Sequence, residues 1–212
     1  MQTIAILGST GSIGTQALEL VRLHPEEFRV VALTARSSRE KLFEQVREFR
    51  PEVAGLTEPI PMSEIPGDVR FCRWVMGEEA LHAAAAEVPA DMVLVSVVGI
   101  AGLQSVMDAL GANRQVLLAN KEALVTGGHL VMDAAKRIGK PMTAGSDAHS
   151  PHRIGEGYLE LPDDLATWQE VLDYIMHNPA PIVCSNSRHL QATLRYGIKS
   201  IGEWLLRGCK RM

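Results

Sequence analysis

The chain has 212 residues, of which 46% are hydrophobic and 22% charged, a composition typical of an ordinary globular protein with one or two domains. Its net charge of -4 gives no reason to expect nucleic acid or an anionic membrane as a partner. No run reaches the roughly 18–20 apolar residues of a membrane span, and the N-terminus lacks the pattern of a signal peptide. The three cysteines are far apart, so we expect a cytoplasmic protein with reduced thiols.

Strands and helices are expected to alternate along the first two thirds of the chain. In chain order, the apolar patterns predict a strand at 3–7, a helix from about 13, a strand at 29–34, a helix at 39–49, a strand at 53–56, a weak strand near 69–72, a helix at 77–87, a central strand at 92–98, a helix to about 110, a strand at 115–119 and a helix from about 122 to 138. Repeated strand–helix–strand units predict an α/β fold, a Rossmann-like doubly wound parallel sheet.

The pattern changes after residue 142. Residues 143–161 contain glycines and a proline but few periodic apolar positions, and they are predicted to form a loop. Helices are expected at 168–176 and 189–206, with a short strand near 181–184. We therefore expect a first domain at 1–142 and a short mixed loop and helical segment at 143–212, which is incomplete as a domain.

A glycine-rich loop follows the first predicted strand and has the sequence Gly8-Ser9-Thr10-Gly11-Ser12-Ile13-Gly14. A phosphate binds where backbone N–H groups approach it closely at the positive end of a helix, and glycines permit that approach. The spacing is G-x-x-G-x-x-G rather than the commoner G-x-G-x-x-G, and Ser9, Thr10 and Ser12 add hydroxyl donors. The loop predicts a phosphate site, and a tight glycine turn without a ligand is the alternative.

The end of the second predicted strand indicates which dinucleotide binds. An NAD site usually places Asp or Glu there for the ribose 2′-hydroxyl, whereas a 2′-phosphate needs cationic and hydroxyl partners. Here the residues are Ala35-Arg36-Ser37-Ser38, with no acid before Glu40. Because Arg36 can pair with a phosphate and both serines can donate to it, NADP(H) is favoured over NAD(H). The alternative is that Arg36 is an ordinary surface arginine in a loop.

Two further blocks carry a resemblance to a known family. They are Val97-Val98-Gly99-Ile100-Ala101-Gly102-Leu103 and Leu118-Ala119-Asn120-Lys121-Glu122-Ala123-Leu124-Val125. Together with the glycine loop, they resemble 1-deoxy-D-xylulose 5-phosphate reductoisomerase over residues 1 to about 140. The resemblance implies an oxidoreductase of non-mevalonate isoprenoid synthesis. It also implies NADPH and Mg²⁺ or Mn²⁺ as cofactors and a sugar phosphate as the substrate.

The resemblance also implies a set of site residues. For the cofactor they are Gly8, Thr10, Gly11, Ser12, Ile13 and Gly14 at the pyrophosphate, Arg36, Ser37 and Ser38 at the 2′-phosphate, Val98, Gly99 and Ile100 under the cofactor, and Ala119, Asn120 and Glu122 on the nicotinamide side. Lys121 is implied as the catalytic residue that contacts the substrate, where an ammonium stabilises charge on the migrating carbonyl system. Without the resemblance, Asn120-Lys121-Glu122 still follows a strand where open α/β sheets place ligand groups, and Asn120 as a helix N-cap is compatible with either interpretation.

The resemblance ends at the family's metal motif. An Asp-Ser-Glu-His-Ser sequence is expected, whose Asp and Glu hold the metal, but this chain has Ser146-Asp147-Ala148-His149-Ser150. Serine replaces the aspartate and alanine replaces the glutamate, and Asp147 is one position out of register, which on a strand reverses its face. We therefore expect that the metal ligands are not intact and that the catalytic domain is incomplete in this chain.

The residues from 143 to 158 instead resemble the C-terminal region of the polymerase and histidinol phosphatase (PHP) phosphoesterases. In that family the Asp and His of Ser-Asp-Ala-His are metal ligands, so Asp147 and His149 are candidate ligands of a divalent metal. No other histidine has a matching ligand spacing, and a polar turn remaining from a larger site is the alternative. The chain therefore resembles a chimera whose two parts join near residues 130–143.

Three hypotheses for function follow. The first is the NADPH-binding domain of a reductoisomerase-like protein, with little or no turnover by this chain alone. The second is a fragment of a metal-dependent PHP-type phosphoesterase, and the third is a non-catalytic NADP-binding module. A homodimer stays open, because the dimer interface of the family uses parts of the catalytic domain that this sequence does not match.

Overall fold

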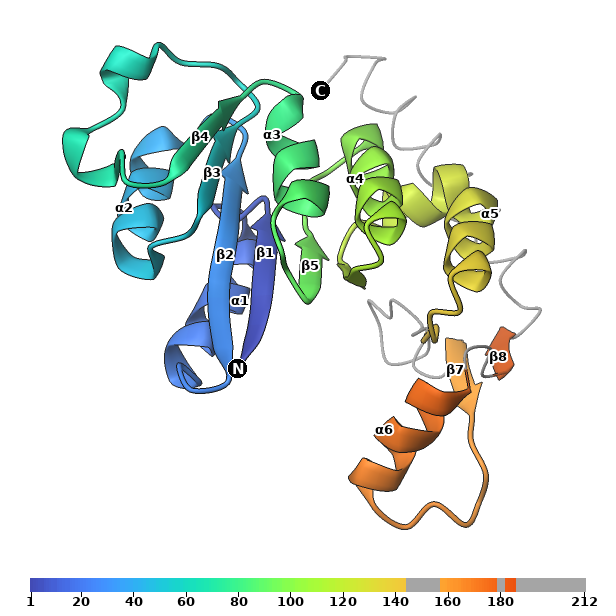
Figure 1. Ribbon diagram of the computed structural model, residues 1–212. Coiled ribbons are helices and arrows are strands. Elements are labelled where there is room, and N and C mark those ends of the chain that lie inside the picture. The colour runs from blue at the N-terminus through green and yellow to red at the C-terminus, as the bar shows by residue number, and fades with distance from the viewer. Residues whose placement is uncertain (144–156, 179–181, 186–212) are drawn as a thin grey trace, which may run out of the picture. The chain divides into compact units, whose positions relative to one another are not determined.

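The computed structural model describes residues 1–143, 157–178 and 182–185 (Figure 1). The chain divides into two compact units, Met1–Lys140 and Pro141–Met212. Among the described residues, no helix is both long enough and apolar enough to cross a membrane. The helix predicted at 189–206 lies outside the described residues.

The first unit is built on a six-stranded sheet whose neighbouring strands all pair in parallel, in the order β4-β3-β2-β1-β5-β6 (Figure 1). Its elements are β1 (Gln2–Leu7), α1 (Ser12–Leu23), β2 (Phe28–Ala35), α2 (Arg39–Phe49), β3 (Val53–Leu56), the 3₁₀ turns Met62–Glu64 and Gly67–Val69, β4 (Arg73–Met76), α3 (Glu79–His82) continued by the π-helical turn Ala83–Glu87, β5 (Met92–Val95), α4 (Ile100–Gly111), β6 (Gln115–Leu118) and α5 (Lys121–Arg137). The prediction of a Rossmann-like doubly wound sheet is confirmed.

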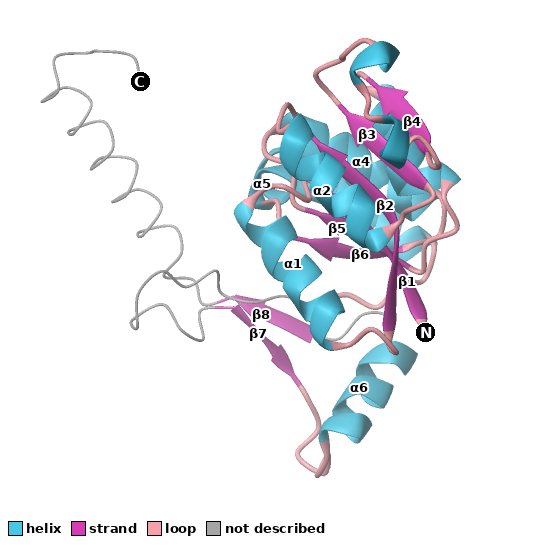
Figure 2. Cartoon of the chain, turned by 90° about the vertical axis from the view of Figure 1, so that its left-hand side faces the viewer, coloured by secondary structure: helices cyan, strands magenta, loops and turns pink. Residues whose placement is uncertain are grey.

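Helices α1 and α2 cover one face of this sheet, the face nearer the viewer in Figure 2. Leu18 of α1 and Leu42 of α2 are almost fully buried there against apolar side chains of β1 and β2. Burying an aliphatic side chain of this size contributes about 1.5–3 kcal/mol, so this layer is a main source of the unit's stability. The same packing fixes β1 and β2, so the loops that follow these two strands start from fixed positions.

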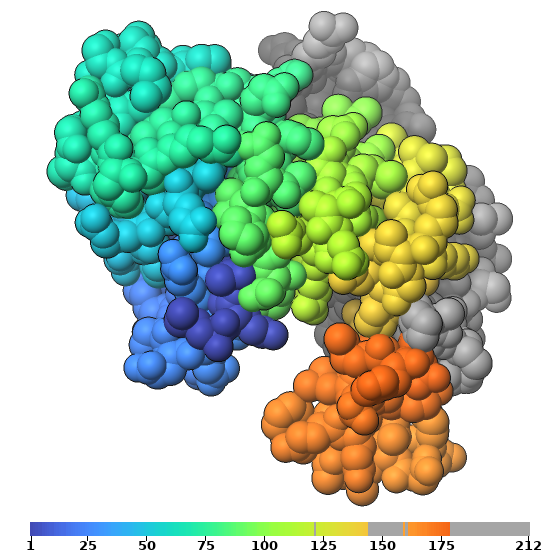
Figure 3. All heavy atoms as spheres, in the orientation of Figure 1, coloured from blue at the N-terminus to red at the C-terminus, as the bar shows by residue number. Residues whose placement is uncertain are grey.

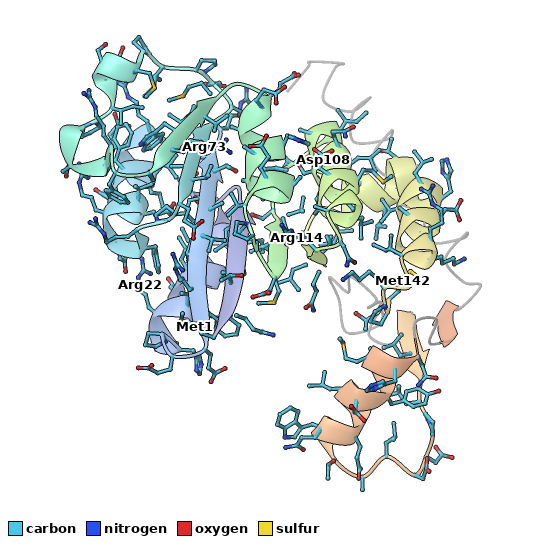
Figure 4. All side chains as sticks on the ribbon, in the orientation of Figure 1. Met1, Arg22, Arg73, Asp108, Arg114 and Met142 are labelled. Carbon is cyan, nitrogen blue, oxygen red and sulfur yellow. The ribbon has the colours of Figure 1, made fainter. Side chains whose placement is uncertain are left out.

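Helices α3 and α4 pack on the opposite side of the sheet. Gly55 of β3 lies so close to α3 that an added Cβ would come 2.7 Å from the Cβ of Ala80. Between the two helices, His82 Nδ1 lies 3.0 Å from Asp108 Oδ2, and Asp108 projects from α4 toward α3 (Figure 4). Helix α5 packs along α4, and the two form a continuous surface (Figure 3).

Three predicted elements of the first unit differ from the structure. The weak strand predicted near 69–72 is wrong: Val69 is the buried last residue of a 3₁₀ turn, and the strand begins at Arg73, which pairs with Val53 of β3. The central strand ends at Val95 rather than at 98, because its partner β1 ends at Leu7. The helix predicted from residue 77 begins at residue 79 and turns into a π-helical segment after four residues.

The described part of the second unit contains β7 (Gly157–Glu160), α6 (Trp168–His177) and β8 (Ile182–Ser185), with β7 and β8 paired antiparallel. Helix α6 is confirmed and begins with a capping box, in which Thr167 and Glu170 each accept a hydrogen bond from the backbone N–H of the other. The prediction of a loop over 143–161 is wrong at Gly157–Glu160. Four residues are too few to show the alternation of a strand, and pairing with β8 determines this one.

Candidate functional site

The predicted cofactor residues gather at one edge of the sheet. They lie in the segments that follow β1, β2, β5 and β6, and parallel strands bring their carboxyl ends to the same edge, which we call the carboxyl edge. The strand order reverses between β1 and β5, so the loop after β1 lies at the topological switch point. Ligands of open α/β sheets bind in the crevice outside this point.

The glycine loop needs two of its glycines for its own packing. Gly8 has a φ of +83°, and an added Cβ would come 2.9 Å from the carbonyl oxygen of Ser96, the residue after β5. At Gly14 an added Cβ would come 2.5 Å from the Cα of Ser9. The first turn of α1 therefore sits directly on the loop, in an arrangement that excludes side chains at both positions.

The N-terminus of α1 is open to solvent. Gly11 is its N-cap and offers no side-chain acceptor, and the first turn contains no acidic residue. The helical bonding begins with the N–H of Thr15, which donates to Gly11 O at 2.9 Å. Within the described chain the N–H groups of Ser12, Ile13 and Gly14 have no acceptor. Such unsatisfied N–H groups at the positive end of a helix form an anion site.

Helix α2 holds the glycine loop from the side. Ser9 is fully buried, and its hydroxyl donates to Gln45 Oε1 at 2.7 Å, while Gln45 Nε2 donates back to Ser9 O at 3.0 Å. Lys41 Nζ donates to Thr10 O at 2.9 Å. The prediction that Ser9 donates to a ligand is wrong, because its side chain points into the protein toward α2. Gln45 was not predicted from the sequence, although a polar residue among the buried positions of this helix is a signal for such a role.

Arg36 is exposed at the carboxyl edge, just after β2. Its side chain is 81% exposed, and its Nε donates to Glu58 Oε1 at 2.7 Å. Ser37 and Ser38 are exposed beside it, and Ser38 stands at the N-cap of α2 without a side-chain cap hydrogen bond. Glu58 was not predicted from the sequence, because it follows the neighbouring strand β3 and lies far from Arg36 along the chain.

The loop after β5 exposes apolar side chains at the carboxyl edge. Val98 is 83% exposed and Ile100 is 75% exposed. Gly99 between them has a φ of +76° and is the N-cap of α4. This left-handed conformation favours glycine and lets the chain turn there with both neighbouring side chains in solvent.

Asn120 connects the loops after β5 and β6. Its side chain is 2% exposed; Nδ2 donates to Val97 O at 2.6 Å and to Gly99 O at 3.0 Å, and Oδ1 accepts from the N–H of Ala123 at 2.9 Å. Asn120 is therefore the N-cap of α5 and also fixes the backbone that carries Val98. Ala119 and Glu122 are exposed on either side, and Lys121 is the first residue of α5.

The candidate metal ligands Asp147 and His149 lie outside the described residues. Within residues 1–143, 157–178 and 182–185 no group of three or more His, Cys, Asp or Glu side chains is placed to hold a metal ion. The arrangement that the described chain does present is a helix start with unsatisfied N–H groups at α1, an exposed cation with two hydroxyls after β2, and exposed apolar side chains after β5.

Two family models match the chain. The model for 1-deoxy-D-xylulose 5-phosphate reductoisomerase matches residues 4–128, and a model described as PHP-associated matches residues 129–178. The boundary between them falls inside α5, directly after Gly127 and Gly128, and Gly127 has non-helical angles of φ -129° and ψ 23°. The boundary between the two matches therefore lies next to a kink in α5.

Known relatives agree with the first match. The reductoisomerase of Moorella thermoacetica is 43% identical over 150 residues, covering 69% of this chain and 39% of the relative. That of Desulfitobacterium hafniense is 40% identical over 152 residues, covering 71% of this chain and 40% of the relative. The chain thus spans about 40% of the length of the relatives it matches.

Solved structures of this enzyme are also similar. The reductoisomerase of Zymomonas mobilis in complex with NADPH has a TM-score of 0.61 at 31% identity, covering 65% of this chain and 37% of that one. A reductoisomerase in complex with magnesium has a TM-score of 0.63 at 37% identity, covering 68% of this chain and 36% of that one. The reductoisomerase family model matches more than half of this chain, so the chain belongs to the 1-deoxy-D-xylulose 5-phosphate reductoisomerase family.

Proposed function

We propose that the first unit binds NADPH along the carboxyl edge of its sheet. The observation that carries the proposal is the open N-terminus of α1 at the same edge as the exposed Arg36, since a dinucleotide phosphate presents separated anionic groups. In this proposal the pyrophosphate lies on the N–H groups of Ser12, Ile13 and Gly14. The 2′-phosphate lies at Arg36-Ser37-Ser38.

The residues present fit such a ligand. The glycine loop has no side chain at Gly8, Gly11 or Gly14 to obstruct an anion, and its outward positions Gly11 and Ser12 are exposed. Val98 and Ile100 offer an exposed apolar surface on which a flat ring can lie, and Ala119 and Glu122 are exposed on either side of Asn120. Asn120 acts indirectly in this site, since its side chain is engaged in holding the loop.

We further propose that the chain is the cofactor part of a reductoisomerase-like protein that acts on a sugar phosphate. Membership in the family supports this, as do solved relatives whose complexes contain NADPH, magnesium or fosmidomycin. NADPH supplies a hydride when bound, and Lys121, next to the proposed nicotinamide site, is the residue we assign to substrate contact. Ser146 and Ala148 stand where the family's metal motif has Asp and Glu, so we expect little or no turnover of the ketose phosphate by this chain alone.

Calorimetry with NADPH and with NADH tests the cofactor proposal. Hydrogen bonds to charged groups contribute about 1.5–3 kcal/mol, so we expect NADPH to bind roughly ten- to a hundred-fold more tightly than NADH. Arg36→Ala removes most of this preference. Arg29→Ala is the matched control, because Arg29 lies at the other end of β2 and also pairs with a glutamate of the β3 segment, Glu52. Equal affinity for both cofactors in the unaltered chain contradicts the assignment of the 2′-phosphate.

The PHP-associated match at residues 129–178 supports a second candidate, a metal-dependent phosphoesterase fragment that uses Asp147 and His149. Metal analysis distinguishes the two proposals. Stoichiometric Zn²⁺ or Mn²⁺ that is lost in His149→Ala favours the phosphoesterase. A chain that binds NADPH but no metal, and oxidises no NADPH with the ketose phosphate, agrees with the first proposal and acts by itself as a non-catalytic module.

A further inference from the structure

Arg36 and Glu58 are held opposite each other by the main chain. The register of β2 and β3 ends with Ala35 opposite Leu56, and the bonding between the two segments continues beyond it. The N–H of Thr57 donates to Ala35 O at 3.0 Å, and the N–H of Glu58 donates to Arg36 O at 2.9 Å. The two side chains therefore start from neighbouring, fixed positions at the carboxyl edge.

The contact between these side chains uses only one part of the guanidinium. Glu58 Oε1 accepts from Arg36 Nε at 2.7 Å. A guanidinium has five N–H groups in a rigid plane, and this bond uses one of them. The two terminal nitrogens of Arg36 have no hydrogen-bond partner within the described part of the chain, and the side chain is 81% exposed.

A second Arg–Glu pair joins the same two segments at their amino ends and has a different geometry. There a terminal nitrogen, Arg29 Nη2, donates to Glu52 Oε1 at 3.0 Å. A glutamate of the β3 segment can thus accept a hydrogen bond from a terminal guanidinium nitrogen of the arginine beside it. Glu58 instead accepts from Nε and leaves the terminal nitrogens of Arg36 available.

We infer that Glu58 is a positioning residue that sets the preference of this site for a 2′-phosphate. It holds Arg36 by Nε, so that the terminal nitrogens face the phosphate as a preorganised, bidentate donor pair. The inference rests on the proposed NADPH site and adds to it a residue that acts on the cofactor through Arg36. Ser38, whose hydroxyl is not used in capping α2, completes the donor set.

The Glu58 carboxylate has two opposed effects on a nearby phosphate. Its hydrogen bond orients Arg36 and strengthens binding, while its negative charge repels the phosphate and weakens binding. Exchange of Glu58 for Gln removes the charge and keeps a side-chain oxygen that accepts from Nε. Exchange for Ala removes both, so a comparison of these two neutral variants isolates the orienting hydrogen bond.

The experiment measures NADPH and NADH affinity of the full chain by calorimetry for Glu58→Gln and Glu58→Ala. We expect Glu58→Ala to bind NADPH about three- to five-fold more weakly than Glu58→Gln, because only the Gln variant keeps a hydrogen bond that orients Arg36. Affinity for NADH is expected to be the same in both variants. In an Arg36→Ala background the difference between Gln and Ala disappears. Glu52→Ala is the control that leaves the cofactor preference unchanged.

Each other outcome overturns the inference. If Glu58→Ala binds NADPH as tightly as Glu58→Gln, the hydrogen bond does not position Arg36. If both cofactors weaken together, the residue acts on the general structure of the edge. These results differ from a failure of the proposed function, which shows itself in the unaltered chain as a lack of preference for NADPH and as no effect of Arg36→Ala.

Discussion

Gly14→Ala is the substitution that tests the packing of the glycine loop most directly. The new Cβ would lie 2.5 Å from the Cα of Ser9 and 2.8 Å from its carbonyl carbon, both main-chain atoms. Overpacking costs about 1–3 kcal/mol, and the upper end applies because main-chain atoms cannot change rotamer. Alanine recovers up to about 1 kcal/mol through its higher helix propensity. We therefore expect the free energy of unfolding to fall by about 2 kcal/mol.

Urea denaturation followed by circular dichroism measures this change as a lower midpoint with an unchanged m-value. Gly111→Ala is the matched control, since Gly111 is also a helical glycine and an added Cβ there would have no neighbour within 4 Å. That variant is expected to be stabilised by about 0.5–1 kcal/mol. Should Gly14→Ala prove as stable as the unaltered chain, the close approach of α1 to the loop is refuted.

Three further predictions concern polar contacts of the first unit. Gln45→Leu leaves the buried Ser9 carbonyl without its side-chain donor and is expected to cost about 1–3 kcal/mol in urea denaturation, whereas an unchanged midpoint would show that the pair contributes nothing. Asn120→Ala removes the N-cap of α5 and is expected to cost about 1–2 kcal/mol and to weaken NADPH binding; unaltered binding would separate this loop from the site. The hydrogen bond to Asp108 is the main reason why the pKa of His82 is raised above its ordinary value of 6.5. The stability that this pair contributes is therefore fully present below pH 6.5 and is lost as the pH rises through the elevated pKa. Asp108→Asn should flatten this pH dependence of the unfolding midpoint, and an unchanged slope would assign it to other groups.

The local sequence was sufficient to predict those helices and strands whose apolar residues repeat with the period of the element itself. Helix α2 was predicted at 39–49 and observed at Arg39–Phe49, because its buried positions repeat with the helical period. The strand β3 was likewise predicted and observed at the same residues. Strand β4 was misplaced by about four residues, since Val69 satisfies its burial in a 3₁₀ turn and the strand follows the register of β3 instead.

The candidate site likewise combines features that the local sequence indicates with contacts that only the fold creates. Gly8, Gly11 and Arg36 could be proposed as site residues from the sequence, because glycine spacing and a cation after a strand are local signals. The burial of Ser9 against Gln45 and the pairing of Arg36 with Glu58 were not predicted. Both join residues more than 20 positions apart in the chain, and no periodic pattern links them.

The sequence alone determined the alternation of strands and helices, the glycine loop before α1 and the change of family character after α5 begins. These depend on periodicity and on residue types close together in the chain. Only the tertiary structure decided which polar groups remain available to a ligand. Hydrogen bonds across β2, β3 and α2 engage Ser9 and one edge of Arg36, and they leave the N–H groups at the start of α1 without an acceptor in the described chain.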